Sequence, residues 1–311
     1  MSKCLVTGGA GFVGSHICEL LIEKGHEVRV IDDFSSGSKE NVKAIGKKIE
    51  LVEGTITKKE TVDEVMKGIE YVFHEAAFVS VPESMKKPGT TWEINIRGTK
   101  LLLNAAVNNK VKRFIFASSA AVYGNDPGLP KKENMLAKVA TSPYANSKRI
   151  GEMLCEEYRK KDKLPTTCLR YFNVYGPRQN PQSEYSGVIT KFITTLAKGE
   201  KPIVYGDGNQ TRDFIFVKDV ANANLIAMEK KASSGTFNVA TGKPTSINDL
   251  LDSIGKVMKK KTLSIMEHER TGDIRESYAD MNKAKKELGF KAEYSLEDGL
   301  KETIEWISKQ K

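Results

Sequence analysis

A glycine-rich turn at the start of the chain constrains its fold more than any other feature of the sequence. The apolar run at residues 4–6 leads into TGGAGFVG (residues 7–14), and a helical pattern begins near Phe12. Glycines permit a tight turn and let backbone N–H groups approach a pyrophosphate at the positive end of the helix dipole. The stretch therefore predicts a dinucleotide-binding strand, turn and helix, with cofactor contacts from Gly8, Gly11, Phe12, Val13 and Gly14.

Short apolar segments alternate with longer helical patterns through the first half of the chain. Strands are expected at residues 3–7, 27–31, 49–53, 70–74, 112–117 and 166–171. Helices are expected near residues 12–24, 58–67, 92–109 and 144–161. This alternation is typical of a parallel sheet with helices on both faces. We therefore predict an α/β fold built on a Rossmann-like doubly wound parallel sheet.

The second half of the chain is less regular, because glycines and prolines interrupt it repeatedly. Helical patterns return near residues 187–198, 218–230, 246–259, 280–288 and 296–309. We predict a smaller, mostly C-terminal α/β substrate domain in this half. The expected division places residues 1–173 and 213–240 in the cofactor-binding domain, and residues 174–212 and 241–311 in the substrate domain.

An aspartate at the end of the second expected strand identifies the dinucleotide. Asp32 lies 18 residues after Gly14, where a carboxylate can accept hydrogen bonds from the adenosine ribose hydroxyls. It would also repel a 2′-phosphate, and no arginine follows it directly. The pattern favours NAD over NADP. Asp33 either assists Asp32 or is a solvated turn residue, and the sequence leaves both readings open.

Tyrosine and lysine stand four residues apart in SPYANSK (residues 142–148), on a helix whose first turn holds Pro143. This spacing puts Tyr144 and Lys148 on one helix face. A phenol is a poor base at neutral pH, but a nearby ammonium and a cationic nicotinamide stabilise the phenolate. Such a pair is common on helix surfaces and does not by itself indicate catalysis. It does so here because the glycine-rich turn, Asp32 and Ser119 accompany it. The combination predicts a tyrosine that accepts a proton.

Composition excludes several other classes of function. The net charge is +9, but the lysines are scattered rather than gathered with aromatic residues, so we expect no nucleic-acid partner. No apolar run approaches the roughly 18 residues of a membrane span, and no signal peptide is expected. The four cysteines lack C-x-x-C spacing, and the four histidines lack ligand-like spacing. We therefore expect a cytoplasmic protein without a metal site or a membrane partner.

The sequence resembles a known family in several separate stretches between residues 7 and 280. They are TGGAGFVG, VIDDFSSG, HEAAFVSVPES, NIRGT, ASSAAVYG, SPYANSK, RYFNVYGPRQ, GDGNQTRDFIFVKDV and ERTGDIRESYAD. Together they resemble the extended short-chain dehydrogenase/reductases, and within these the NAD-dependent nucleotide-sugar 4-epimerases. The resemblance implies a UDP-sugar substrate bound in the smaller domain.

The resemblance also implies roles for individual positions. Catalysis falls to Ser119, Tyr144 and Lys148. Besides the glycine-rich turn and these residues, NAD contacts are expected from Asp32, Asp33, Ser36, Gly37, Thr55, Ile56, Ala76, Ala77, Asn95 and Tyr171. Substrate contacts are expected from Ser80, Ser118, Ser119, Tyr144, Asn173, Gly187, Val188, Tyr205, Arg212, Arg270, Asp273 and Ser277. Thr55 departs from the family, whose members usually carry an aspartate that contacts the adenine amino group.

Two alanines in ASSAAVYG indicate which reaction follows the shared oxidation at the sugar C4. By resemblance, the positions of Ala120 and Ala121 hold Asp-Glu in the 4,6-dehydratases and Ser-Glu in the decarboxylases. Methyl groups cannot transfer protons, so the 4-keto intermediate is expected to turn over and take its hydride back on the other face. The sequence thus favours C4 epimerisation.

The substrate pair follows from one small residue. By resemblance, Ser277 occupies the position where epimerases restricted to glucose and galactose carry a bulky tyrosine beside the sugar C2 group. The smaller serine leaves volume there for an N-acetyl group. The resemblance favours UDP-GlcNAc/UDP-GalNAc, with UDP-Glc/UDP-Gal also accepted. UDP-glucuronate 4-epimerisation, a net NAD-dependent dehydrogenase or reductase, and a non-catalytic NAD(H)-binding regulatory protein remain as alternatives. The resemblance also implies a homodimer formed through the helices expected at residues 92–109 and 144–161.

Overall fold

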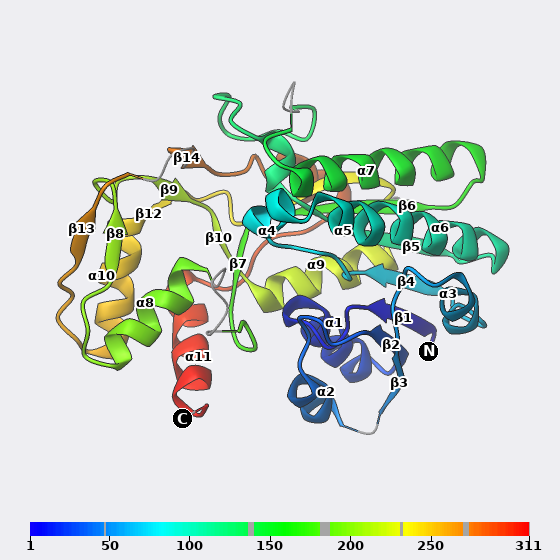
Figure 1. Cartoon of the computed structure of the whole chain (residues 1–311), viewed down its shortest axis with the longest axis horizontal. Coiled ribbons are helices and arrows are strands. Elements are labelled where there is room, and N and C mark those ends of the chain that lie inside the picture. Colours follow the sequence, from blue (N-terminus) through cyan, green and yellow to red (C-terminus); the bar gives the residue numbers. More distant parts are fainter. Residues whose placement is uncertain (47, 136–139, 181–186, 231–232, 270–273, 311) are drawn as a thin grey trace.

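A seven-stranded sheet forms the core of the larger part of the molecule (Figure 1). The computed structural model describes residues 1–46, 48–135, 140–180, 187–230, 233–269 and 274–310. The strands are β1 (Lys3–Thr7), β2 (Glu27–Asp32), β3 (Ile49–Glu53), β4 (Tyr71–His74), β5 (Arg113–Ser119), β6 (Thr166–Tyr171) and β11 (Gly235–Val239). Their order is β11-β6-β5-β4-β1-β2-β3, and every neighbouring pair is parallel.

The chain reverses direction across the sheet between β1 and β4. From β1 it moves outward through β2 to β3, and it then returns to place β4 on the other side of β1. In open α/β sheets, ligands bind outside the carboxyl ends of the strands at such a reversal. The topology therefore places the candidate site at the ends of β1, β4 and their neighbours, and it confirms the predicted fold class.

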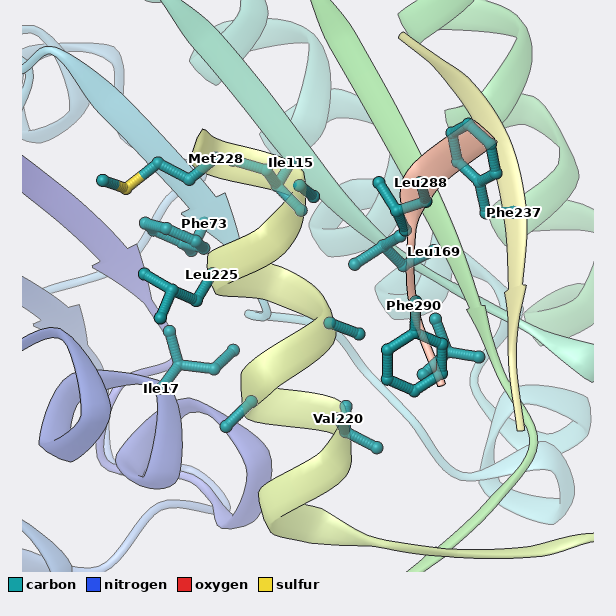
Figure 2. Packing of buried hydrophobic residues seen from close by; sticks show 14 of the residues in the cluster. Ile17, Phe73, Ile115, Leu169, Val220, Leu225, Met228, Phe237, Leu288 and Phe290 are labelled. Atoms are coloured by element: carbon teal, nitrogen blue, oxygen red, sulfur yellow. The ribbon is translucent and has the colours of Figure 1, made fainter. Parts of the chain in front are cut away.

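Helices cover both faces of this sheet, as the strands' continuous apolar sequences require. One face carries α1 (Phe12–Glu23), α2 (Lys39–Ile45) and α9 (Val217–Glu229), and the other carries α3 (Lys59–Val65), α6 (Thr99–Asn108) and α7 (Pro143–Lys161). Figure 2 shows the first face, where Leu225 and Met228 of α9 pack with Ile17 of α1 against Phe73 and Ile115 of the sheet. On the second face, the apolar cluster includes Val62, Leu102, Phe114, Phe116 and Cys155.

Three further elements lie beside the N-terminal end of α7. They are α4 (Val81–Lys86), α5 (Pro88–Trp92) and the π-helical segment η1 (Glu93–Gly98), which continues into α6. A 3₁₀ turn, η2 (Ala120–Tyr123), follows β5 directly, and its N-cap is Ser119. Helices α4, α5 and the η1 segment all contact α7. They therefore help to fix the end of the helix that carries Tyr144.

The remaining elements form a smaller region on the other side of the molecule (Figure 1). Its helices α8 (Val188–Ala197), α10 (Ile247–Met258) and α11 (Leu296–Ser308) enclose a third apolar cluster. Its short strands pair as β7 (Asn173–Tyr175) with β10 (Phe214–Phe216), β8 (Ile203–Tyr205) with β13 (Ile265–Glu267), and β9 (Thr211–Arg212) with β12 (Thr245–Ser246) and β14 (Glu276–Ser277). A further π-helical segment, η3 (Ala284–Leu288), packs on β11. The predicted division into two domains stays a prediction.

One central difference from the expected elements is the seventh strand, β11. Its sequence, GTFNV, is short and carries the polar Asn238 within the apolar run. In the structure Asn238 is fully buried, accepts a hydrogen bond from the Tyr123 hydroxyl (2.5 Å), and donates to the carbonyl oxygens of Lys131 and Asp280. These partners satisfy the hydrogen-bonding groups of the buried amide, so the strand tolerates Asn238. The polar residue interrupts the apolar run by which a strand is predicted from sequence.

Candidate active site

The glycine-rich turn forms a backbone cradle that larger residues would fill. Gly8 has φ +70°, and a Cβ there would lie 2.8 Å from the backbone nitrogen of Ala76. A Cβ at Gly14 would lie 2.2 Å from the carbonyl oxygen of Gly8. Helix α1 begins after Gly11, and no side chain in the described part of the chain caps it. Its first N–H groups therefore remain for an anion, as a pyrophosphate requires.

Asp32 is held as an acceptor at the end of β2. Its Oδ2 accepts a hydrogen bond from the Ala10 N–H and its Oδ1 accepts one from the Phe34 N–H, each at 2.9 Å. Burial raises the pKa of Asp32, while these two bonds oppose the rise. Gly37 closes over it, since a Cβ there would lie 2.8 Å from Asp32 Oδ1. The cradle and this fixed carboxylate fit the pyrophosphate and ribose of a dinucleotide.

Asp33 and Ser36 lie just beyond this carboxylate and are exposed. The Asp33 carboxylate accepts hydrogen bonds from the N–H and the hydroxyl of Ser35 at 3.0 and 2.6 Å. This geometry favours the reading of Asp33 as a turn residue. Its expected contact with the cofactor stays a prediction.

The other residues expected at NAD lie along the same edge of the sheet. Thr55 and Ile56 follow β3, and Ala76 and Ala77 follow β4. The Thr55 hydroxyl accepts a hydrogen bond from the Thr57 N–H (3.3 Å) and lies 3.0 Å from the Thr57 hydroxyl. The Thr55 hydroxyl is therefore hydrogen-bonded within its own turn, to Thr57.

A buried histidine connects the cofactor edge to the catalytic side. His74 Nδ1 lies 2.8 Å from the Thr7 hydroxyl, and its Nε2 lies 2.8 Å from the Thr99 hydroxyl. Because Thr99 donates to the Asn95 carbonyl, its oxygen must accept from His74, which places the proton on Nε2. Burial lowers the pKa of His74 to about 3, so the ring is neutral. In the sequence His74 ends an apolar run after Phe73, and nothing there indicated that it connects Thr7 to Thr99.

Ser119, Tyr144 and Lys148 come together where β5 meets the start of α7. The side chains of Ser119 and Tyr144 are hydrogen-bonded to each other. Lys148 is 4% exposed, its Nζ donates to the Ala117 carbonyl (2.7 Å), and it lies 5.9 Å from the centroid of the Tyr144 ring. The structure thus brings the three predicted catalytic residues into one cluster.

The electrostatics of this cluster suit proton transfer. Burial lowers the pKa of Lys148 to about 8, and nearby carboxyl and thiol groups, Glu75 first among them, oppose the shift. Burial raises the pKa of Tyr144, the hydrogen bond from Ser119 opposes this, and the charge of Glu75 adds to it. A phenol beside a cation can take a proton from an alcohol and later return it.

The start of α7 is fixed by two serines. Ser142 caps the helix by accepting a hydrogen bond from the Ala145 N–H (3.1 Å), and Pro143 occupies its first turn. Ser84 of α4 is fully buried and accepts a hydrogen bond from the Tyr144 N–H at 3.2 Å. Ser84 ends the stretch HEAAFVSVPES. Its contact with Tyr144 could not be derived from sequence spacing, because the two residues are 60 positions apart.

Asn95 lies between the catalytic helix and the strand end after β4. Its Oδ1 accepts a hydrogen bond from the Phe78 N–H (2.7 Å), and its Nδ2 donates to the Phe78 carbonyl and to the Ser147 hydroxyl. Ser147 in turn donates to the Tyr144 carbonyl at 2.8 Å. Asn95 therefore acts on backbone geometry in this structure, and its expected contact with the cofactor stays a prediction.

Two serines expected at the substrate are engaged elsewhere in the structure. The Ser118 hydroxyl donates to Glu152 Oε1 (2.5 Å), and Glu152 forms a buried ion pair with Arg170. Successive strand residues face opposite ways, so Ser118 cannot share the position of Ser119. Ser80 caps α4 by accepting a hydrogen bond from the Glu83 N–H at 3.1 Å. Neither hydroxyl is directed at the cluster of Ser119, Tyr144 and Lys148.

The residues expected at the sugar nucleotide lie mainly in the smaller region. Arg212 of β9 and Ser277 of β14 are direct partners in the strand register. Tyr205 ends β8, Gly187 is the N-cap of α8 with Val188 in its first turn, and the exposed Asn173 begins β7. Arg270 and Asp273 lie outside the described residues.

A buried aspartate next to Arg212 ties these segments together, although sequence patterns did not single it out. Asp213 accepts hydrogen bonds from the N–H and hydroxyl of Thr241 and from the N–H groups of Gly242 and Ala279, at 2.6 to 3.2 Å. Burial raises the pKa of Asp213, and these bonds oppose it. The carboxylate therefore holds the strand of Arg212 beside the segment that follows Ser277.

The described residues show neither a metal centre nor a membrane helix. No group of three or more histidine, cysteine, aspartate or glutamate side chains within them could hold a metal ion. No helix among them is long and apolar enough to cross a bilayer.

Comparisons with known proteins agree with this geometry. Residues 4–240 match the model of the NAD dependent epimerase/dehydratase family. A Methanocaldococcus jannaschii protein, provisionally named a UDP-glucose 4-epimerase, is 40% identical over 97% of both chains. A UDP-N-acetyl-alpha-D-glucosaminuronate decarboxylase of Bacillus cytotoxicus is 35% identical over 98% of this chain and 97% of its own. The solved UDP-N-acetylglucosamine 4-epimerase of Methanobrevibacter ruminantium M1 matches with a TM-score of 0.95 and 38% identity, over 100% of this chain and 99% of its own.

Proposed function

The chain belongs to the NAD dependent epimerase/dehydratase family and is a UDP-sugar 4-epimerase, and we propose that its preferred substrates are UDP-GlcNAc and UDP-GalNAc. UDP-Glc and UDP-Gal are the second pair. The observation that carries the choice of substrate is the small side chain of Ser277 beside Arg212 in the strand register. The choice of reaction rests on Ala120 and Ala121.

The catalytic cluster supplies the proton chemistry of this reaction. NAD, when bound, accepts a hydride from the sugar C4 and gives it back. Tyr144 removes the proton from the sugar 4-hydroxyl, and Ser119 supports it through their hydrogen bond. The charged Lys148 stabilises the phenolate, and Tyr144 returns the proton when the 4-keto sugar is reduced on its other face.

Ala120 and Ala121 favour epimerisation over elimination or decarboxylation. Both begin the 3₁₀ turn that Ser119 caps, with the Ala121 N–H donating to the Ser119 hydroxyl at 3.1 Å. An acid or base at either position would stand one or two residues from the catalytic serine. Methyl groups offer no proton there, which favours reduction of the ketone over elimination or decarboxylation. The similarity to a decarboxylase does not extend to this chemistry, because neither side chain can act on the sugar C5 or C6.

The Ser277 argument predicts a specificity change in one variant. In Ser277→Tyr, kcat/KM for UDP-GlcNAc is expected to fall about 10- to 100-fold, because a bulky ring in a filled site costs about 1–3 kcal/mol. Turnover of UDP-Glc should change little. Initial rates for both pairs, measured by chromatographic separation of the epimers, check this. A matched Ser308→Tyr variant, at an exposed position at the end of α11 and outside the site, should leave both rates unchanged.

The same assay on the unmodified protein decides among the other candidates. No turnover of the acetylated pair would contradict the proposal, and turnover of UDP-glucuronate alone would establish the second candidate. A dehydrogenase or reductase would consume added NAD or NADH in proportion to product, whereas an epimerase needs no added hydride donor. A regulatory NAD(H)-binding protein would turn over none of these sugars.

We also propose that the chain forms a homodimer through the face that holds α5, α6 and α7. Trp92 ends α5 and Met153 lies in α7, and they are 56% and 61% exposed. Exposed apolar side chains that gather into one patch mark a contact with another molecule, and we assign Trp92 and Met153 to such a patch. The double variant Trp92→Glu and Met153→Glu is expected to sediment as a monomer where the unmodified protein sediments as a dimer. A monomeric unmodified protein at micromolar concentration would contradict the proposal.

A further inference from the structure

Glu75 places a carboxylate at the catalytic end of the sheet, and the chemistry described above does not use it. It directly follows β4, next to His74 and before Ala76. Its Oε1 accepts a hydrogen bond from the Tyr171 hydroxyl at 2.8 Å. Asn224 of α9 donates through Nδ2 to the same hydroxyl, also at 2.8 Å. The carboxylate is therefore held by residues from two other elements.

The direction of these bonds makes the carboxyl group of Glu75 an acceptor. Asn224 Nδ2 donates both to the Val220 carbonyl (2.9 Å) and to the phenol oxygen of Tyr171. Because that oxygen accepts from Asn224, its hydrogen points to Glu75, which becomes the terminal acceptor. An ionised carboxylate is the best acceptor at the end of such a chain. Glu75 forms no salt bridge with any lysine or arginine of the described residues, so its charge acts on its surroundings unneutralised by direct contact.

The surroundings of Glu75 are the reacting groups themselves. Tyr171 is the register partner of Ser119 across β5 and β6, so the bond from Tyr171 to Glu75 spans the end of β5. The charge of Glu75 also acts on both Tyr144 and Lys148, whose pKa values it raises. Burial raises the pKa of Glu75 to about 7, and Tyr171 and Lys148 oppose the rise. The carboxylate thus lies within electrostatic reach of the site where hydride leaves the sugar.

We propose that Glu75 is a positioning and charge-setting residue that favours the oxidised over the reduced cofactor in this epimerase. The inference rests on the proposed function. The oxidised nicotinamide ring carries a positive charge and the reduced ring is neutral. In its ionised form, Glu75 at this end of the cradle therefore stabilises the oxidised form selectively. An epimerase must begin each turnover with the oxidised form, so such a bias keeps the resting protein competent.

The test measures the bound cofactor rather than the reaction. Holoprotein is equilibrated with a mixture of NAD⁺ and NADH, free nucleotide is removed, and the bound nucleotides are released and quantified by chromatography. In Glu75→Gln, the bound ratio of NADH to NAD⁺ is expected to rise about tenfold, as befits the loss of one charge several ångströms away in a partly buried site. Glu75→Met, a second neutral side chain of similar length, should give the same rise if the amide variant folds poorly.

Two further variants separate charge from structure. Tyr171→Phe removes the donor but keeps the carboxylate, so its ratio should rise much less than in Glu75→Gln. Glu93→Gln loses a half-buried carboxylate of η1 that pairs with Arg97, and its ratio should not change. Thermal melts establish that each variant is folded.

Each result decides the proposal. An unchanged ratio in Glu75→Gln and Glu75→Met would overturn it. Equal loss of both nucleotides from folded variants would overturn it as well, because Glu75 would then hold the cofactor without distinguishing its two forms. Either result leaves the epimerase assignment intact if the unmodified protein interconverts UDP-sugars. Failure of the unmodified protein in that assay would count against the proposed function instead.

Discussion

Replacing Tyr144 with phenylalanine is expected to lower kcat for UDP-sugar epimerisation by about 10³-fold, the central value for loss of a general base. The variant lacks only the hydroxyl that takes the proton from the sugar. Its ring still occupies the same space, and the Tyr144 N–H still donates to Ser84. KM and the melting temperature should therefore change little. Steady-state rates and thermal melts check both parts.

Tyr158→Phe is the matched control for this change. Tyr158 lies on the same helix, and its hydroxyl donates to Asn104 (2.5 Å), away from Ser119 and Lys148. Its removal should leave kcat unchanged. Near-normal turnover in Tyr144→Phe would show that another group accepts the proton. Glu75, with a pKa of about 7, would then be the first residue to examine.

Lys148→Met is expected to lower kcat by about 10²-fold at neutral pH and to shift the pH profile to higher pH. A charged Lys148 favours the phenolate and so lowers the pKa of Tyr144. Without it, burial holds the pKa of Tyr144 above its usual value, and more alkaline solution is needed to deprotonate it. In the unmodified protein, the benefit of the ammonium should be present at low pH and fade as the pH rises through about 8.

Measuring kcat/KM from acid to alkaline pH tests this sign. The control is Lys161→Met, at the exposed C-terminal end of the same helix, where only Glu157 pairs with it among the described residues. It should retain the profile of the unmodified protein. A Lys148→Met profile that falls in amplitude but keeps its acidic limb would show that Lys148 positions groups without setting the pKa of Tyr144.

Local sequence signals were sufficient for most of the sheet. Six strands lie at or within two residues of the predicted ranges, because each is an apolar run bounded by turn residues. The glycine-rich turn also had an explicit physical requirement, seen in the space around Gly8 and Gly14. β11 escaped prediction because the partners of Asn238 come from distant segments.

The candidate site could be predicted only in part, for a related reason. Tyr144 and Lys148 are linked by helical spacing, which is local. Ser84 and Glu75 act through contacts with residues far away in the sequence, and no local pattern distinguishes them from ordinary polar residues. Ser118 and Ser119 are adjacent, and alternation on the strand separates them, but only the fold shows which of the two faces Tyr144.

The neutral histidine at the centre of the sheet has a consequence for anyone who wishes to alter this protein. Its bonds belong to one polar line that joins the last residue of the first strand to the carbonyl of the catalytic tyrosine, and further bonds from the Ala76 N–H to Thr7 and from Asn95 to the Phe78 carbonyl tie this line to the strand end after β4. Cofactor retention and turnover therefore share a single mechanical support. A variant meant to weaken cofactor retention without loss of turnover must therefore keep this line intact. The line runs through Thr7, His74, Thr99, Asn95, Ser147 and Tyr144.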